Sequence, residues 1–399
     1  MNQHDLSSGS SLRRVINVAG TMTSIGSSII VPEAVEAAAA IAPRFVEMAD
    51  VHRRASSAIA AVTGAEAGFV TASCSASITI AVAGAMTGSD LAAIERLPNS
   101  AGLKNEIVIQ AGHLVNYGAP LDQAIRLSGA EVVSVGQSTS AAAYQLSGAI
   151  TERTAAGLFV VSHHVVHYGQ IPLRTFAQVC HGKGVPVIVD AASEYDLRRF
   201  LEEGADLVLY SGHKFLGGPT SGFGAGARQL VQAAYLQNRG IGRGMKVGKE
   251  SIAGLLAALE AWKRRDHDGL RARELETLES WAGALSGRPG VSAAAIPDAT
   301  GNPLSRLLVE IDPGQARITA WDLAARLTES EPAIYVRDEE VEHGRIELDP
   351  CNLHPGDAQI VAARMVEELE KAGQGAIPVA TSLEQFWLQK EAAAGKWPD

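Results

Sequence analysis

The chain has 399 residues, of which 46% are hydrophobic and 20% charged, and its formal net charge at pH 7 is −10. This composition is that of a globular protein with one large domain and one smaller domain. The acidic balance, without any long block of Lys or Arg, argues against a nucleic acid as the partner.

Cysteine usage and hydropathy indicate the compartment. Cys74, Cys180 and Cys351 are widely spaced and odd in number, which favours a reducing cytoplasm over a disulfide framework. Residues 68–89 carry no charge, but their Ser and Thr side chains favour a strand, a turn and a helix inside a globular core over a membrane span. We therefore expect a cytoplasmic protein without a membrane partner.

The first half of the chain predicts an alternation of strands and helices. Residues 1–15 are expected to form a loose tail, and Pro32–Ala42 and Phe45–Thr63 are expected to be helices. Short apolar strands are predicted at Gly68–Thr71, Glu106–Ile109, Glu131–Val135, Leu158–Val161, Pro186–Asp190 and Asp206–Tyr210, with helices at Leu121–Ser128, Leu173–Gly182 and Leu197–Glu203. This order indicates an α/β fold with a mainly parallel sheet.

The second half has a different texture. Residues 249–285 predict a long helical stretch, interrupted near His267, and the segment after Pro289 predicts a compact α+β unit. We predict three parts: an N-terminal segment, 1–45, associated with the small domain; a large domain, 46–265; and a small C-terminal domain, 266–399.

Lys214 and Asp190 carry the chemical prediction. Each follows a buried apolar strand, and the ligand site of a parallel sheet lies beyond the carboxyl ends of its strands. A lysine there, if not a surface side chain of a Gly-rich loop, is placed to form a Schiff base, and an aspartate, if not a helix cap, is placed to hold a pyridine nitrogen. The pair predicts pyridoxal 5′-phosphate (PLP) as cofactor.

Several further residues are predicted to hold this cofactor. The segment Thr71–Ser77 follows a strand and opens a helix, so Ser73, Cys74 and Ser75 are candidates for a phosphate cradle, to which Ser211 adds a hydroxyl. His113 is predicted to stack on the cofactor ring opposite Ala192, and His213 flanks the lysine.

Other patterns carry less. The three histidines at 163, 164 and 167 lack further ligands, so no metal site is predicted. The Gly-x-Gly of residues 222–226 lacks an acidic residue placed for a ribose, which excludes a dinucleotide fingerprint. Arg345 is the first candidate for a substrate carboxylate, with Arg337 and Arg243 as alternatives.

With these motifs, the chain resembles fold-type-I PLP enzymes, and among them the group of bacterial selenocysteine synthase and D-glucosaminate-6-phosphate ammonia-lyase. The resemblance covers about residues 16–262, and its specific stretches are Ser211–Gly218 and Gly242–Glu250. It implies an aspartate aminotransferase-like fold, Lys214 as the Schiff-base lysine, Asp190 as the pyridine partner, His113 as the stacking residue, and a homodimer or larger assembly.

The expected activity is that of a lyase on an amino acid or amino-sugar acid. Lys214, deprotonated near neutral pH by an adjacent positive charge, is expected to take the Cα proton, after which β-elimination releases ammonia and a 2-oxo acid. A racemase or epimerase, a β-replacement transferase, and a non-catalytic binding protein that keeps the fold remain alternatives.

Overall fold

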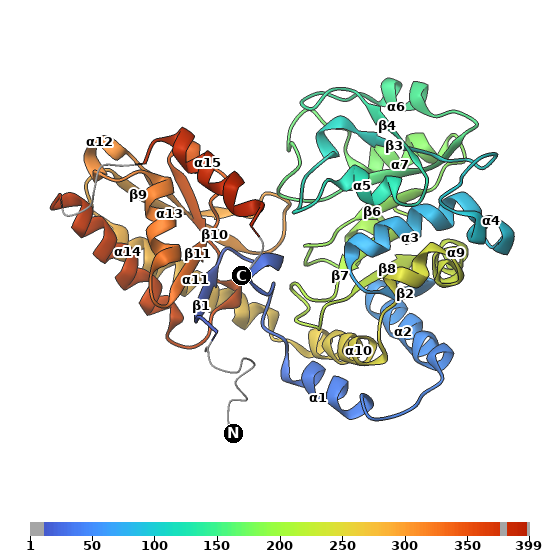
Figure 1. Ribbon diagram of the computed structural model, residues 1–399, viewed down its shortest axis with the longest axis horizontal. Helices are drawn as coiled ribbons and strands as arrows, with labels where there is room; N and C mark the ends of the chain where they lie inside the picture. Colours follow the sequence, from blue (N-terminus) through green and yellow to red (C-terminus); the bar gives the residue numbers. More distant parts are fainter. Residues whose placement is uncertain (1–11, 376–380, 397–399) are drawn as a thin grey trace. The chain divides into compact units, whose positions relative to one another are not determined.

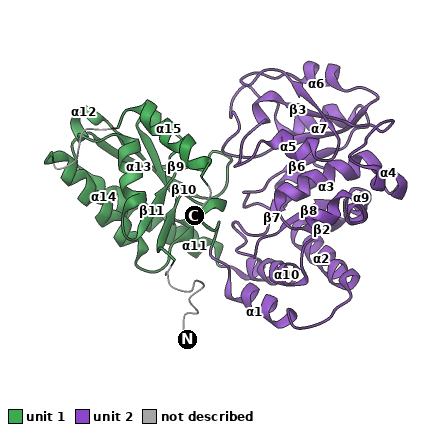
Figure 2. Ribbon diagram, viewed as in Figure 1, with its two compact units in different colours: residues 1–28, 266–399 green, residues 29–265 purple. Residues whose placement is uncertain are grey.

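A computed structural model describes residues 12–375 and 381–396. It divides into two compact units, one of residues 1–28 and 266–399 and the other of residues 29–265 (Figure 2). The boundary after residue 265 is the same as in the predicted domains, whereas the first boundary follows residue 28 and not residue 45.

The larger unit is built on a seven-stranded sheet with the order β2-β8-β7-β6-β5-β3-β4 (Figure 1). All of its pairings are parallel except the two made by β8, which runs opposite to β2 and β7. The strands are β2 (Ala67–Thr71), β3 (Glu106–Gln110), β4 (Glu131–Val135), β5 (Thr154–Val160), β6 (Val187–Asp190), β7 (Leu207–Ser211) and β8 (Gly222–Gly226). The predicted α/β class with a mainly parallel sheet is confirmed.

Both faces of this sheet are covered, which explains why its strands are continuously apolar. Successive side chains of a strand point to opposite faces. Val187, Val189 and Val208 accordingly lie in one core cluster, and Ile188 and Leu207 lie in another. The first cluster takes its helical residues mainly from α2 (Met48–Thr63), α7 (Leu173–His181) and α10 (Lys249–Arg264), and the second from α3 (Cys74–Thr87), α5 (Leu121–Arg126) and α9 (Arg228–Leu236).

Strand β8 was not predicted, because it consists of Gly, Phe, Gly, Ala and Gly. Its glycines are needed where neighbours come close. A Cβ on Gly222 would lie 2.3 Å from the carbonyl oxygen of Ser73, and one on Gly224 would lie 2.2 Å from the ring of Phe69. The segment that lacked a dinucleotide signature is therefore a structural strand beneath the first turn of α3.

The smaller unit contains two sheets. Strand β1 (Val15–Val18) pairs in parallel with β11 (Ala333–Val336), and β12 (Arg345–Leu348), β10 (Ser305–Ile311) and β9 (Val291–Pro297) form an antiparallel sheet in that order. The helices α11 (His267–Leu285), α13 (Ala320–Glu329) and α14 (Asp357–Gly373) complete its core with Leu278, Trp281 and Leu323 among the buried residues. It is an α+β unit, as predicted.

The remaining helices are short or peripheral. They are α1 (Pro32–Ile41), α4 (Leu91–Arg96), α6 (Ala143–Ala149), α8 (Arg199–Glu202), α12 (Pro313–Ala316) and α15 (Leu383–Ala394). The stretch 249–285 is interrupted before His267, where the Asp266 side chain caps α11 by accepting the N–H of Gly269. Among the described residues, no helix is both long and apolar enough to cross a bilayer.

Candidate active site

Asp190 and Lys214 meet at the carboxyl ends of two neighbouring parallel strands. Asp190 ends β6 and pairs with Leu209 of β7, while Lys214 lies three residues beyond Ser211, the last residue of β7. The N–H of Ala191 donates to the carbonyl of Leu209 at 2.9 Å, so the turn after β6 stays bound to β7. The sheet itself therefore brings the two functional groups together.

The Asp190 carboxylate is buried, with 6% of the residue exposed. Its Oδ1 accepts the N–H of Ala192 at 3.2 Å and the thiol of Cys74 at 3.5 Å. Burial raises the pKa of Asp190, although the positive charge of Lys214 opposes the shift. A carboxylate in this environment is stabilised by a cationic partner, such as a protonated ring nitrogen.

The amine of Lys214 donates a hydrogen bond of 2.6 Å to the hydroxyl of Ser193. Burial lowers the pKa of Lys214, whereas the neighbouring Cys74 and the carboxylates of Asp190 and Glu194 oppose this shift. The sequence predicts an adjacent positive charge as the cause. The structure gives burial instead, and the neighbouring carboxylates of Asp190 and Glu194 are negative. A lysine with a lowered pKa is suited to serve as nucleophile and base.

The first turn of α3 lies next to Asp190. Ser73 caps this helix, its hydroxyl accepting the N–H of Ala76 at 3.1 Å and its carbonyl accepting the N–H of Ser77 at 3.0 Å. The N–H groups of Cys74 and Ser75 precede these, and helix geometry gives them no carbonyl acceptor within α3. This end of a 14-residue helix can bind an anion.

Two contacts fix the cradle in place. The hydroxyls of Thr71 and Ser77 lie 2.6 Å apart, and the hydroxyl of Ser75 lies 2.8 Å from that of Tyr117. Burial raises the pKa of the Cys74 thiol well above its ordinary value, and the negative charge of Asp190 is the second cause of this shift. Cys74 is therefore a neutral donor and not a reactive thiolate.

These groups fit PLP. The buried Asp190 suits the ring nitrogen, the Lys214 amine suits the aldehyde, and the donors of the α3 N-terminus suit the phosphate. The thiol contact between Cys74 and Asp190 shows that the cradle and the carboxylate are neighbours. The chain thus brings the three expected kinds of group close together.

Comparison with known proteins identifies the family. Residues 15–287 match the family described as L-seryl-tRNA selenium transferase (SelA). The chain belongs to the SelA family. The chain is 40% identical over 361 residues to D-glucosaminate-6-phosphate ammonia lyase of Salmonella typhimurium (strain 14028s / SGSC 2262), covering 90% of this chain and 97% of that protein. It is also 38% identical over 357 residues to 5′-C-glycyluridine monooxygenase-decarboxylase of a Streptomyces species, covering 89% and 90%.

Solved structures of other proteins have a similar fold. The structure of D-glucosaminate-6-phosphate ammonia-lyase matches with a TM-score of 0.81 at 40% identity, covering 90% of this chain and 97% of that chain. A serine palmitoyltransferase from S. paucimobilis with bound PLP matches with a TM-score of 0.56 at 16% identity, covering 90% and 88%, which shows the fold alone. The family and fold neighbours of this chain are PLP-dependent enzymes, and the predicted aminotransferase-like fold and group are confirmed.

In this SelA-family chain, three predicted cofactor residues line the strand ends. Ala192 donates its N–H to Asp190, and its carbonyl accepts the N–H of Ser211 at 3.3 Å. The Ser211 side chain interacts with the Cys74 thiol. The Nδ1 of His213 donates to the carbonyl of Ser221 at 3.3 Å, and burial lowers the pKa of His213. The roles assigned to these side chains stay predictions.

His113 is the buried end of a short 3-10 turn (Ala111–His113) that follows β3. Its Nδ1 accepts the N–H of Val160 at 3.0 Å, and its ring packs edge-on against Phe159 with the centroids 4.5 Å apart. Burial, together with the charge of His167, lowers the pKa of His113 to about 4, so the ring is neutral at physiological pH. A neutral flat ring is compatible with the predicted stacking, which stays a prediction.

The three candidate arginines lie in different surroundings. In the larger unit, Arg243 is exposed on the 3-10 turn Ile241–Met245. In the smaller unit, Arg337 is buried, with its Nε 3.4 Å from Glu347. Arg345 begins β12, and its guanidinium lies 3.1 Å from Glu310. A substrate carboxylate at Arg345 would therefore compete with an existing ion pair, and the choice among the three stays a prediction.

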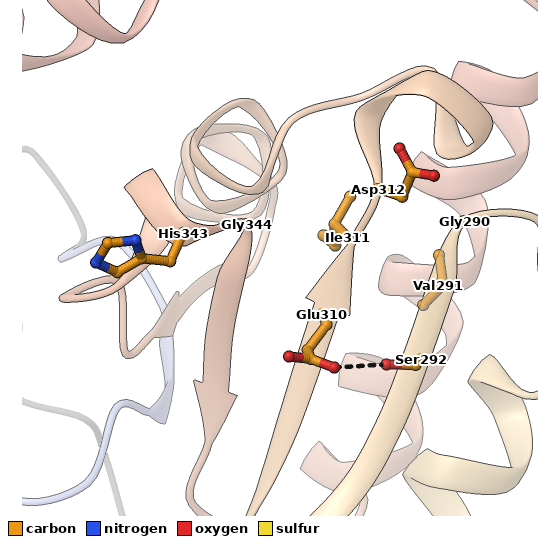
Figure 3. A pocket seen from close by; sticks show the side chains of 8 residues that line it. All are labelled: Gly290, Val291, Ser292, Glu310, Ile311, Asp312, His343 and Gly344. Carbon is orange, nitrogen blue, oxygen red and sulfur yellow. Dashed lines mark hydrogen bonds between the residues drawn. The ribbon is translucent and has the colours of Figure 1, made fainter.

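The smaller unit has a hollow of its own. It is lined at the strand ends of β9 and β10 by Ser292, Glu310, Asp312 and His343, with Ser292 donating to Glu310 at 3.2 Å (Figure 3). None of its lining residues was predicted for the cofactor, and its carboxylates do not suit a phosphate. Within residues 12–375 and 381–396, no group of three or more His, Cys, Asp or Glu residues could hold a metal ion.

Sequence reasoning missed three residues of the site: Ser193, Glu194 and Tyr117. Ser193 and Glu194 follow Asp190 on the same turn, so their spacing could have drawn attention to them. Tyr117 lies in a loop between β3 and α5, and no pattern indicates that its hydroxyl reaches Ser75.

Proposed function

We propose that the chain is a PLP-dependent lyase that acts on an amino acid or amino-sugar acid by Cα deprotonation and β-elimination, releasing ammonia and a 2-oxo acid. The observation that carries the proposal is the Lys214 amine beside the buried Asp190 carboxylate, at the strand ends next to the α3 N-terminus. The similarity to D-glucosaminate-6-phosphate ammonia lyase, which extends over most of both chains, supports the ammonia-lyase class.

Lys214, Asp190 and the first turn of α3 would hold the cofactor. When bound, PLP supplies an aldehyde that condenses with amines and a ring that withdraws electrons from the bonds at a substrate Cα. Asp190 keeps the proton on the ring nitrogen by offering a carboxylate that lacks full hydration. The N–H groups of Cys74 and Ser75 and the hydroxyl of Ser73 orient the phosphate.

Lys214 has two tasks. Its Nζ would hold the cofactor covalently, and as a free amine it would take the proton from the substrate Cα. The lowered pKa caused by burial makes the amine available as a base nearer to neutral pH. Departure of the substituent on Cβ, followed by replacement of the nitrogen by water, completes the reaction.

Colour and product analysis test the proposal. The purified chain with added PLP is expected to develop a visible absorbance band, and a panel of amino acids and phosphorylated amino-sugar acids is expected to yield a 2-oxo acid with ammonia in equal amounts. Inverted chirality without ammonia would instead support a racemase, and incorporation of an added thiol would support β-replacement. Oxygen uptake with release of CO₂ would support a decarboxylating monooxygenase, the class of the Streptomyces relative. A chain that stays colourless with PLP would support the non-catalytic alternative.

A matched pair of lysine variants sharpens this test. Lys214→Ala is expected to lose both the absorbance band and turnover. Lys183→Ala removes an exposed lysine after α7 and is expected to change neither. Full activity of Lys214→Ala would refute the assignment.

We further propose that the chain forms a homodimer or larger homo-oligomer in the cytoplasm. Residues 29–48 of the larger unit expose Ile29, Val35, Phe45 and Met48, and Phe45 is fully exposed. Such a concentration of apolar surface is typical of a protein interface. Light scattering is expected to give at least twice the monomer mass, and Phe45→Asp is expected to lower it, whereas Leu127→Asp on α5's C-terminal end is not. A wild-type monomer would refute the proposal.

A further inference from the structure

The Lys214 amine has a defined hydrogen-bond acceptor on the turn after β6. Its Nζ donates to the Ser193 hydroxyl at 2.6 Å, a short hydrogen bond for a charged donor. Ser193 has no role in the cofactor contacts proposed above. Its hydroxyl therefore serves the lysine itself, and this inference rests on the proposed function.

Ser193 lies on a turn whose backbone is fixed. The N–H of Ala191 donates to Leu209 at 2.9 Å, the N–H of Ser211 donates to Ala192 at 3.3 Å, and the N–H of Glu194 donates to Ala191 at 3.2 Å. The position of the hydroxyl is thus set by the edge between β6 and β7.

The loop that carries Lys214 is fixed as well. The N–H of Gly217 donates to the Lys214 carbonyl at 2.9 Å, and the guanidinium of Arg265 donates to the carbonyls of Phe215 at 2.7 Å and Leu216 at 3.1 Å. The flexible side chain of Lys214 therefore connects two segments whose backbones are held by hydrogen bonds, its own loop and the turn that carries Ser193. The hydrogen bond to Ser193 favours one conformation of this side chain.

We propose that Ser193 is a positioning residue that holds the amine of Lys214 whenever this amine is not bonded to the cofactor. During the part of the cycle in which a substrate amine has taken its place, the lysine is then held in the site as a base. Without the hydroxyl, the amine has more freedom and its protonated form loses an acceptor.

The test uses the full-length chain freed of cofactor and mixed with saturating PLP. The rate at which the visible band appears, measured over a range of pH, reports the fraction of Lys214 that is unprotonated. Removing a neutral acceptor from an ammonium disfavours the charged form, so Ser193→Ala is expected to move the midpoint of this profile down by about one pH unit. The groups that face the amine, Cys74, Asp190 and Glu194, are the same in both proteins.

Two further variants keep the test specific. Ser193→Thr retains a hydroxyl and is expected to keep the wild-type midpoint. Ser221→Ala removes a hydroxyl that donates to Pro219 in the same loop region, and it is also expected to keep the midpoint. Ser193→Gly provides a second removal of the hydroxyl if the alanine variant folds poorly.

An unchanged midpoint in Ser193→Ala and Ser193→Gly would overturn the inference, as would an equal shift in Ser193→Thr. In the loaded enzyme, the acidic limb of the kcat profile of Ser193→Ala is expected to move with the capture profile while KM stays the same. If the wild-type chain forms no visible band, the proposed function fails, and that result is distinct from a band that forms identically with and without the Ser193 hydroxyl.

Discussion

The buried His113 is expected to make the fold sensitive to acid. Its Nδ1 accepts the N–H of Val160 and its ring is 2% exposed, so a proton added there would remove an acceptor and bury a charge. The replacement His113→Asn keeps a side-chain oxygen where Nδ1 accepts this hydrogen bond, but it cannot titrate.

The sign and size follow from the pKa. Burial lowers the pKa of folded His113 from 6.5 to about 4, so the unfolded chain binds this proton first as the pH falls. Stability is therefore lost progressively as the pH falls from about 6.5 to about 4, with little further loss below. At pH ~4.5 the linkage relation gives a loss of about 2.5 kcal/mol relative to pH ~7, from a shift worth about 1.4 kcal/mol per pH unit.

Urea unfolding of both proteins at the two pH values isolates this contribution. Every other titrating group is common to wild type and variant, so the difference between their losses reports His113. We expect the wild type to lose about 2.5 kcal/mol more than His113→Asn on acidification. Equal losses in the two proteins would show that the folded histidine protonates normally, and the account of its burial would be wrong.

Three further replacements test the site and the strands that support it. Gly222→Ala places a Cβ 2.3 Å from backbone atoms of Ser73, so it is expected to cost ~3 kcal/mol of stability and to weaken PLP binding. As a control, Gly283→Ala adds a Cβ with nothing within 4 Å in the exposed part of α11, and it is expected to stabilise the chain by ~0.5 kcal/mol in the same denaturation experiment. A Gly222→Ala protein that binds PLP normally would contradict the close approach to Ser73. Asp190→Asn is expected to abolish most turnover and to raise the melting temperature of the cofactor-free chain at neutral pH. Because the pKa of Asp190 is higher in the folded chain than in the unfolded chain, its ionisation destabilises the fold once the pH rises above the pKa of the unfolded chain. A lower melting temperature of the variant, measured by calorimetry, would refute this.

Much of the large unit could be predicted from its sequence because parallel strands buried on both faces are short, continuous apolar runs. The prediction failed at β8, since Gly222–Gly226 carries only one large apolar side chain, Phe223, and is recognisable as a strand only once Ser73 and Phe69 are seen against it. In the smaller unit, the pairing of β1 with β11 joins segments more than 300 residues apart in the chain, and no local pattern encodes it.

The site divides in the same way. Lys214 and Asp190 were predictable because the end of a strand is a local feature and the chemistry of each side chain is distinctive. The contact between Cys74 and Asp190 joins residues 116 positions apart, and it depends on how α3 lies over the sheet. The cause of the lowered pKa of Lys214 could not be read from neighbouring sequence either, because burial is a property of the folded chain.

The antiparallel strand β8 also sets a length. Thr71 pairs with Gly222, and Gly222 pairs with Ser211, so one row of main-chain hydrogen bonds crosses from the strand that leads into α3 to the strand that leads into Lys214. Neighbouring strands lie about 4.8 Å apart, so the two ends of the row are separated by about 10 Å whatever side chains surround them. The main-chain pairing of the sheet thus sets this distance independently of the side chains. Loops that contact a substrate can therefore change in sequence while the spacing between these two strand ends stays the same.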